Sequence, residues 1–125
     1  MMEDKRTEKR KIGDAGEDAA CTLLAREGYK VVFRNYGCRI GEIDIVAVHP
    51  VEGVLAFVEV KTRRDTHFGL PCEAVGREKQ RKLKLCANYF MLREKAYSHL
   101  QPSMDIVEIL HTDLGLFGRH LKNAF

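Results

Sequence analysis

The sequence lacks the features that mark a membrane-spanning or secreted protein. No apolar run approaches the roughly 20 residues that a helix needs to cross a bilayer, so we expect no membrane partner. The N-terminus is charged between residues 3 and 11, which leads us to expect no secretory signal and a cytoplasmic location. No internal repeat, low-complexity segment or linker is present, so the 125 residues are expected to form one compact domain.

Cysteine is sparse and scattered. Its four positions, 21, 38, 72 and 86, include no Cys-x-x-Cys pair, and this spacing does not resemble a zinc site. In a chain expected to stay in the cytosol, reduced thiols are the simplest interpretation. The hydrophobic fraction of 45% is ordinary for a globular protein and sufficient for a core.

The net charge is small but unevenly distributed. It is +3 for the whole chain, yet residues 61–95 hold ten Lys or Arg and four Asp or Glu, a difference of +6. A basic segment beside an acidic one suits a phosphate-binding protein, because cations hold the backbone and carboxylates hold a metal. A charged, solvated helix face explains the same residues and stays open as an alternative.

Two helices are predicted from apolar periodicity and end signals. A charged tail over residues 1–12 precedes a helix over 14–27, in which Asp14 is the N-cap and Glu17 completes a capping box. The second helix is predicted over 72–95. Strands are expected over 29–36 and 104–110, with a short final strand in 114–125 that packs its aromatic side chains, and residues 62–71 are expected to form a loop in which His67 is solvated.

Residues 41–61 organise the rest of the chain. Two apolar, β-branched runs flank a short segment with Pro50 and Gly53, which predicts a hairpin. If the turn is centred between residues 51 and 52, paired residues have numbers that add to 103. Asp44 then lies opposite Glu59.

The same register places Glu42 opposite Lys61. Strand alternation puts Glu42 and Asp44 on one face of the first strand, with Ile43, Ile45 and Ala47 on the other.

The pairing of Asp44 with Glu59 is electrostatically unfavourable for a sheet alone. Directly opposed side chains lie about 4.5–5.5 Å apart at Cβ, and like charges there are destabilising. A hard divalent cation resolves the conflict, since carboxylate oxygens are its preferred ligands. A solvated polar face in which Lys61 pairs with Glu42 or Glu59 is the alternative that the pattern leaves open.

Cations crowd the first half of the second predicted helix. Positive charge near a helix start opposes the macrodipole, so the cluster suggests an external anion. Arg63 lies two residues beyond Lys61 and would share its face if the strand continues, where a guanidinium could clamp phosphate through two hydrogen bonds. The helix cations are Arg77, Lys79, Arg81, Lys82 and Lys84.

Three motifs resemble those of the YraN-like family of small bacterial proteins. They are Gly13-x-x-Gly16-Glu17-x-x-Ala20, the run Gly41-Glu42-Ile43-Asp44-Ile45-Val46-Ala47, and Phe57-Val58-Glu59-Val60-Lys61-Thr62-Arg63. Phe68-Gly69, the helix around Lys79 and the closing Asn123-Ala124-Phe125 also match, so the resemblance covers nearly the whole chain from Gly13 onward.

That family is similar to the restriction-endonuclease-like, or PD-(D/E)XK, nucleases, near the Holliday-junction resolvases. The resemblance implies an α/β fold over residues 13–125, in which helices flank a mixed central sheet. Asp44 matches the motif aspartate, Glu59 and Lys61 match its Glu-x-Lys, and Glu17 matches the acidic residue of the first helix. The motif's proline is absent, because Ile43 precedes Asp44.

The implied function is that of a metal-dependent endonuclease that acts on nucleic acid, with branched or damaged DNA as the expected substrate. Asp44, Glu59 and the carbonyl of Val60 would hold Mg²⁺ or Mn²⁺, while Lys61 and Glu17 would assist catalysis. The residues expected on the phosphate backbone are Arg63, Lys79, Arg81 and Lys82.

Two other functions remain open. One is a nucleic-acid-binding module without catalysis, and the other is an interaction protein whose sheet edge pairs with a partner chain. A homodimer is compatible with all three functions, and a resolvase-like activity would favour it because a junction offers two symmetric cuts.

Overall fold

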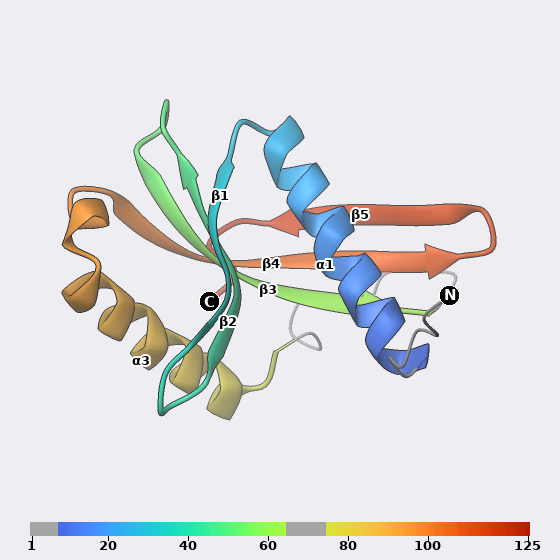
Figure 1. Cartoon of the computed structure of the whole chain (residues 1–125), viewed down its shortest axis with the longest axis horizontal. Coiled ribbons are helices and arrows are strands. Elements are labelled where there is room, and N and C mark those ends of the chain that lie inside the picture. Colours follow the sequence, from blue (N-terminus) through green and yellow to red (C-terminus); the bar gives the residue numbers. More distant parts are fainter. Residues whose placement is uncertain (1–7, 65–74) are drawn as a thin grey trace, which may run out of the picture.

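A five-stranded sheet forms the centre of the molecule (Figure 1). The computed structural model describes residues 8–64 and 75–125; most of the expected loop, with His67, lies outside them. The elements in chain order are α1 (Glu8–Arg26), β1 (Lys30–Gly37), β2 (Glu42–His49), β3 (Val54–Arg63), α3 (Arg77–Arg93), the 3-10 turn η1 (Lys95–Tyr97), β4 (Gln101–Thr112) and β5 (Gly115–Leu121).

The strands lie side by side in sequence order, and one of the four pairings is parallel. β3 and β4 run parallel, whereas the other three neighbouring pairs are antiparallel. Parallel neighbours need a long crossover connection, and α3 lies within that connection. The prediction of a mixed central sheet with flanking helices in a single α/β domain is therefore confirmed.

The two helices cover opposite faces of the sheet, each with its own apolar cluster. The α1 cluster includes Ala20, Leu24, Ile45, Ala47, Ala56, Val58, Val107 and Ile109. The α3 cluster includes Ile43, Val46, Leu55, Phe57, Leu83, Cys86, Phe90 and Ile106. Burying both faces explains why the central strands are apolar at nearly every position.

The predicted hairpin is confirmed, and its register holds from the turn as far as Ile45 and Val58; the predicted pairs Asp44–Glu59 and Glu42–Lys61 lie beyond the end of the ladder. β2 pairs with β3 from Ile45 opposite Val58 to His49 opposite Val54, and every pair adds to 103. Gly53 closes the turn with a φ of 68°, a left-handed conformation that glycine adopts without steric cost. Its N–H donates to the carbonyl of His49 at 2.9 Å.

The predicted alternation along β2 is wrong at one point. Ile45 packs in the α1 cluster, but Ile43 packs in the α3 cluster on the other face. The strand therefore rotates at Asp44. In β1, Asn35 lies between the partners of Ile43 and Ile45 and has a φ of 54°, so the neighbouring strand is irregular at the same level.

Both helices begin at residues other than those predicted. α1 starts at Glu8, so Asp14 lies inside the helix rather than at its N-cap. Residues 8–12 lack apolar periodicity, but Glu, Lys and Arg are good helix formers without it. α3 starts at Arg77, with Gly76 at the N-cap position and Val75 outside the helix.

The last two strands differ from prediction in length and exposure. β4 begins at Gln101 and includes Pro102, which was expected to precede it. β5 pairs with β4 only from Ile106 onward, so one side of β4 is unpaired at Pro102. A proline, which has no backbone N–H to donate, is tolerated at such a position. The final strand is confirmed as β5, but the expected packing of its aromatics fails at Phe117, which is 50% exposed.

Candidate active site

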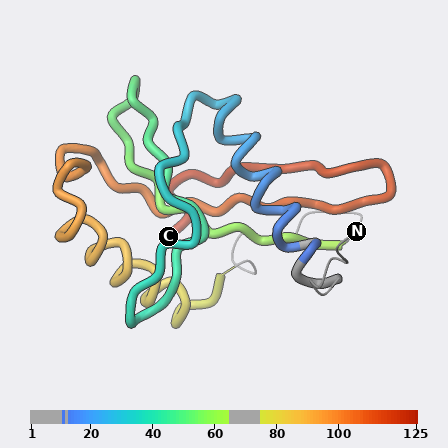
Figure 2. The backbone as a smooth tube through the Cα atoms, viewed as in Figure 1, coloured from blue at the N-terminus to red at the C-terminus, as the bar shows by residue number. Residues whose placement is uncertain are grey.

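A polar cleft of about 360 Å³ opens where β2 and β3 diverge, between the two helices. In Figure 2 the first half of α1, the end of β3 and the start of α3 all lie in the lower half of the view. The cleft brings together six of the predicted site residues from four elements. Its lining is Gly13, Glu17, Asp44, Glu59, Val60, Lys61, Thr62 and Lys79.

Asp44 replaces the β2–β3 ladder with a side-chain hydrogen bond. The last paired residues are Ile45 and Val58, and beyond them the backbone N–H of Val60 donates to Oδ2 of Asp44 at 2.8 Å. Burial and, after it, the adjacent negative charge of Glu59 together raise the pKa of Asp44 to about 7. Two neighbouring carboxyls repel each other when both are ionised, so a positive charge placed between them would stabilise the ionised forms.

Glu59 receives positive charge from α3. Its side chain is only 6% exposed, and its Oε1 lies 2.5 Å from Nζ of Lys79. Burial works to lower the pKa of Lys79, but the hydrogen bond and charge of Glu59 outweigh it, so the pKa is raised. Lys61, the expected alternative partner, is exposed at the cleft and makes no ion pair within the described parts of the chain.

Glu17 reaches the cleft from α1 because the helix lies close to β3. Gly16 permits this approach, since a Cβ atom there would overlap the side chain of Thr62. Burial raises the pKa of Glu17, and the nearby charge of Asp44 adds to the effect. Arg34 of β1 donates to Oε2 of Glu17 at 3.3 Å and to Asp18 at 2.9 Å, so the carboxylate is held partly by a cation.

The cleft offers few donors for a metal ion. Among the described residues, no three His, Cys, Asp or Glu side chains come close enough to hold one. The neighbouring carboxyls of Asp44 and Glu59 could offer two side-chain ligands. Two carboxylates still suit Mg²⁺, which keeps several waters and takes only one or two carboxylate ligands. The ammonium of Lys79 now neutralises Glu59, as such a dication would.

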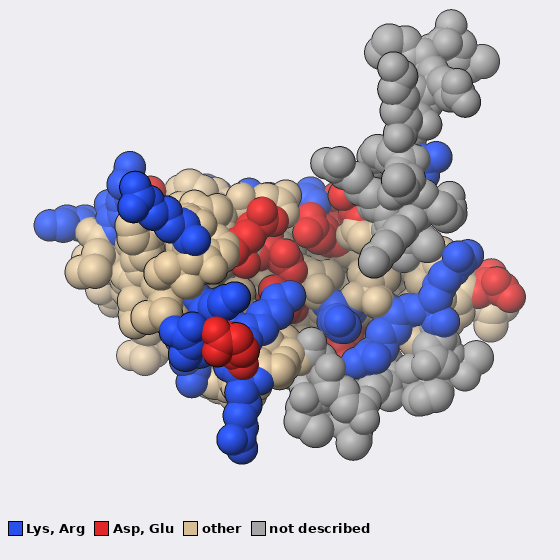
Figure 3. Space-filling model, turned by 90° about the horizontal axis from the view of Figure 1, so that it is seen from below, with Lys and Arg blue, Asp and Glu red and all other residues tan. Residues whose placement is uncertain are grey.

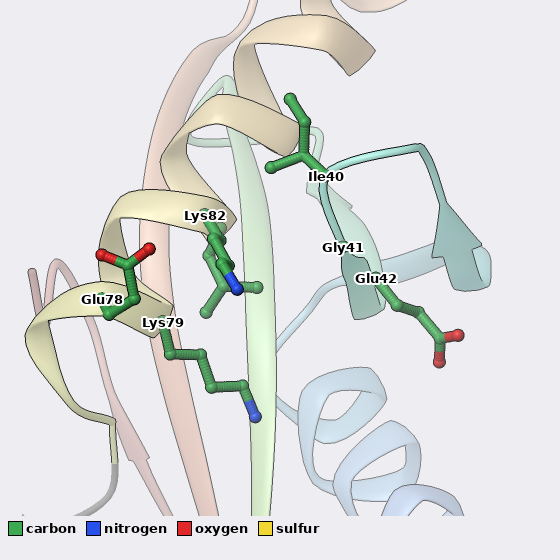
Figure 4. A pocket seen from close by; sticks show the side chains of 7 residues that line it. Ile40, Gly41, Glu42, Glu78, Lys79 and Lys82 are labelled. Atoms are coloured by element: carbon green, nitrogen blue, oxygen red, sulfur yellow. The ribbon is translucent and has the colours of Figure 1, made fainter.

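A second cleft of about 490 Å³ adjoins the first and shares Lys79 with it. Lys79 and Lys82 extend from α3 toward β3, whereas Glu78 points to the other side (Figure 4). We call this the lysine cleft; its lining is Ile40, Gly41, Glu42, Glu78, Lys79, Lys82 and Leu83.

The surface around the two clefts separates the charges. On the face seen in Figure 3, acidic side chains gather near the middle, and Lys and Arg side chains form a band beside them. Arg81, another predicted phosphate contact, forms an exposed ion pair with Glu78 of the same helix at 2.7 Å.

Arg63 is placed differently from the prediction. It does not line either cleft; its Nε lies 3.9 Å from Oε2 of Glu108, a carboxylate with no exposed surface. Arg119 of β5 binds both oxygens of Glu108 at 3.3 Å. Burying an unpaired carboxylate is costly, and the guanidinium of Arg63 helps to compensate the buried charge of Glu108.

A buried polar network at the other end of the sheet escaped the sequence analysis. His120 of β5 bridges Oδ2 of Asp105 at 2.7 Å and Oε2 of Glu27 at 2.6 Å. Ser103 hydrogen-bonds to Asp105 and Asn123. The signal in the sequence is that two acids, Asp105 and Glu108, interrupt an apolar strand.

These observations define a class of protein: a small α/β domain with paired carboxylates in a cleft at a break in the sheet, beside a lysine-rich helix. Neither described helix is both long and apolar enough to traverse a bilayer.

The family model of the uncharacterised protein family UPF0102 matches residues 16–109. The chain belongs to this family, which confirms its resemblance to the YraN-like proteins. It is 48% identical over 118 residues to a UPF0102 protein of Symbiobacterium thermophilum, which covers 93% of this chain and 97% of that protein. A UPF0102 protein of Caldicellulosiruptor saccharolyticus is 45% identical over 124 residues, covering 94% and 98%.

Proposed function

We propose that this protein is a metal-dependent endonuclease of the restriction-endonuclease-like, PD-(D/E)XK class, acting on DNA. The observation that carries the proposal is the pairing of Asp44 with Glu59 in a cleft beside Lys61. Burial and mutual repulsion raise the pKa of Asp44 to about 7, and perturbed carboxyls in a cleft are characteristic of functional sites. The mixed sheet with helices on both faces is consistent with that class.

Asp44, Glu59 and the carbonyl of Val60 would hold Mg²⁺ or Mn²⁺. When bound, the ion would supply a Lewis acid that lowers the pKa of a coordinated water and polarises a phosphate oxygen. The N–H of Val60 fixes the orientation of Asp44 at 2.8 Å, so little reorganisation would be needed. Metal binding would favour the ionised form of Asp44, because opposite charge lowers the pKa of a carboxyl.

The remaining residues would position the substrate. Lys61 is exposed at the cleft, where its ammonium would orient the attacking water or share the charge of the scissile phosphate. Lys79 would move from Glu59 to the phosphate backbone when a dication neutralises that carboxylate. Lys82 would extend the backbone contact along the lysine cleft, giving affinity without sequence readout.

The test combines cleavage with metal binding. The purified chain is incubated with branched, single-stranded and linear DNA in Mg²⁺ or Mn²⁺, and Mn²⁺ binding is measured separately by calorimetry. Asp44→Asn and Glu59→Gln should each abolish cleavage and weaken Mn²⁺ binding at least tenfold. Glu52→Gln, an exposed change at the far turn of the same hairpin, should leave both unchanged. Cleavage that survives both cleft substitutions refutes the assignment.

A non-catalytic DNA-binding module is the second candidate, and one observation favours it. Lys79 already forms an ion pair with Glu59 at 2.5 Å, so this carboxylate is compensated without a metal ion. This function predicts DNA binding with no cleavage in any metal, and Asp44→Asn would then leave DNA affinity within twofold of the wild-type value. Saturable Mn²⁺ binding that depends on Asp44 would argue against it.

A further inference from the structure

Two thiols meet between the β1–β2 turn and α3. The Sγ atoms of Cys38 and Cys86 lie 3.0 Å apart, although the residues are 48 positions apart in the chain. Both are free thiols, as is Cys21 on α1. A disulfide bond measures about 2.05 Å, so closing one here requires an approach of about 1 Å.

The two thiols differ in reactivity. Burial works to raise the pKa of Cys38, but hydrogen bonds with Cys86 and with the backbone of Ile40 and Gly41 outweigh it, so the pKa falls below its ordinary value of 9.0. Burial and the contact with Cys38 raise the pKa of Cys86 to about 12. Because the thiolate is the nucleophile, Cys38 is the thiol that reacts first.

The two thiols also differ in access. Cys38 is half-buried and lines a cleft of about 480 Å³ with Arg39, Ile40 and Tyr89. Cys86 has no exposed surface. A small oxidant can therefore reach Cys38 from solvent, whereas the Cys86 thiol is enclosed, with the sulfur of Cys38 and the carbonyl oxygen of Gly41 as its hydrogen-bonding neighbours.

We propose that Cys38 and Cys86 are a redox-active pair that peroxide converts to a disulfide. The Cys38 thiolate attacks one oxygen of hydrogen peroxide, the O–O bond breaks, and the departing hydroxide takes up a proton as water. Cys86 Sγ then attacks Sγ of the resulting sulfenic acid, the S–O bond breaks, and the second hydroxide leaves as water with the thiol proton. Two thiols lose two electrons, and one peroxide becomes two waters.

The bond would join two walls of the lysine cleft. Ile40 and Gly41 follow Cys38 in the turn, and Lys82 precedes Cys86 on α3 by about one helical turn. A covalent link would hold the turn against the helix. This chemistry depends on the sulfur geometry alone, so it stands whether or not the protein cleaves DNA.

The test treats the full chain with a small molar excess of hydrogen peroxide and then counts free thiols after denaturation. The count should fall from four to two, the tryptic map should contain a Cys38–Cys86 linked peptide, and dithiothreitol should restore all four thiols. The midpoint of thermal unfolding should rise on oxidation. The control is Cys21→Ser, which removes a half-buried thiol on α1. On peroxide treatment this variant should still lose two free thiols.

Cys38→Ser and Cys86→Ser should each abolish the linked peptide and the shift in the unfolding midpoint. The map of the wild-type chain decides the question even if a variant fails to fold. The proposal is overturned if Cys38 is oxidised to sulfinic acid while Cys86 stays reduced, if the count remains four, or if the linked peptide contains Cys21 or Cys72 instead.

Discussion

At the scale of single residues, the properties of the cleft follow from one carboxyl whose ionised form is disfavoured by its surroundings. Asp44 is half-buried, accepts one backbone N–H and lies beside Glu59. Its pKa is raised from 3.8 to about 7. The folded chain therefore binds a proton at Asp44 more tightly than the unfolded chain does.

This difference predicts a pH-dependent stability that Asp44→Asn removes. The raised pKa contributes stability that is fully present below pH 3.8 and lost as the pH rises to about 7. Across that window the free energy of unfolding of Asp44→Asn should improve relative to wild type by about 1–3 kcal/mol. Urea unfolding at several pH values measures it.

The control for this series is Asp113→Asn, which changes an exposed carboxyl in the β4–β5 turn. Its difference from wild type should stay level across the same pH range. If the difference for Asp44→Asn were equally level, the Asp44 carboxyl would titrate in its ordinary range and the electrostatic description of the cleft would fail.

His120 makes a second pH-dependent prediction of the same sign, although it is a base held by two acids. Burial works to lower the pKa of His120, but its hydrogen bonds to Asp105 and Glu27 raise it above 6.5. The resulting stabilisation is fully present below pH 6.5 and is lost as the pH rises through the folded-state pKa. His120→Gln should cost about 3–5 kcal/mol at pH 6, because Asp105 stays buried without its cation.

The cost of His120→Gln should shrink at pH 9, where the wild-type imidazole has also lost its charge. His99→Gln, an exposed histidine before β4, should change stability by less than about 0.5 kcal/mol at either pH. A cost that is independent of pH would mean that His120 is neutral in the folded protein.

At the scale of elements, the position of α1 over β3 depends on a glycine. Gly13 and Gly16 lie on the same helix, yet a Cβ at Gly13 meets nothing within 4 Å, whereas one at Gly16 overlaps Thr62. The close approach at Gly16 is what brings the neighbouring Glu17 to the cleft.

The two glycines therefore predict opposite effects of the same substitution. Gly13→Ala should stabilise the protein by about 0.5–1 kcal/mol, because alanine favours the helix. Gly16→Ala should destabilise it by about 1–3 kcal/mol, because the helix must move away from β3. Thermal unfolding of the two variants measures both signs, and stabilisation by Gly16→Ala would contradict the close packing of α1.

At the scale of the whole molecule, acidic and basic side chains occupy separate parts of one face. This separation determines which part of the surface would bind a polyanion such as DNA. The clefts combine an acidic centre with lysines of α3 (Figure 3). The net charge is only +3, so any affinity for DNA must come from the local arrangement rather than from overall attraction.

If the α3 lysines contact phosphates, DNA affinity should depend on salt in a residue-specific way. Lys82→Gln should lower affinity for all sequences alike and reduce the slope of log K against log salt by about 0.9. Lys30→Gln, at the other end of the β1–β2 pair from Asp44, should leave the slope unchanged. Fluorescence anisotropy at several salt concentrations measures both, and equal slopes in the two variants would exclude α3 from the interface.

The sequence by itself determined the hairpin, its register and the elements that carry the site. Turn residues and alternating apolar runs act over a few neighbouring positions, so Asp44 and Glu59 could be brought together without coordinates, although the ladder itself ends at Ile45 and Val58. The motif residues Glu17, Lys61 and Lys79 were likewise correctly grouped.

Only the tertiary structure decided how the charges are paired. Lys79 neutralises Glu59, Arg34 holds Glu17, and Glu108 is buried between arginines of β3 and β5. The tertiary structure also revealed that Ile43 and Ile45 pack on opposite faces of the sheet. The physical reason is that the partner of a charged side chain depends on how deeply it is buried and on which distant segments pack against it. The local residue pattern of a strand contains neither kind of information.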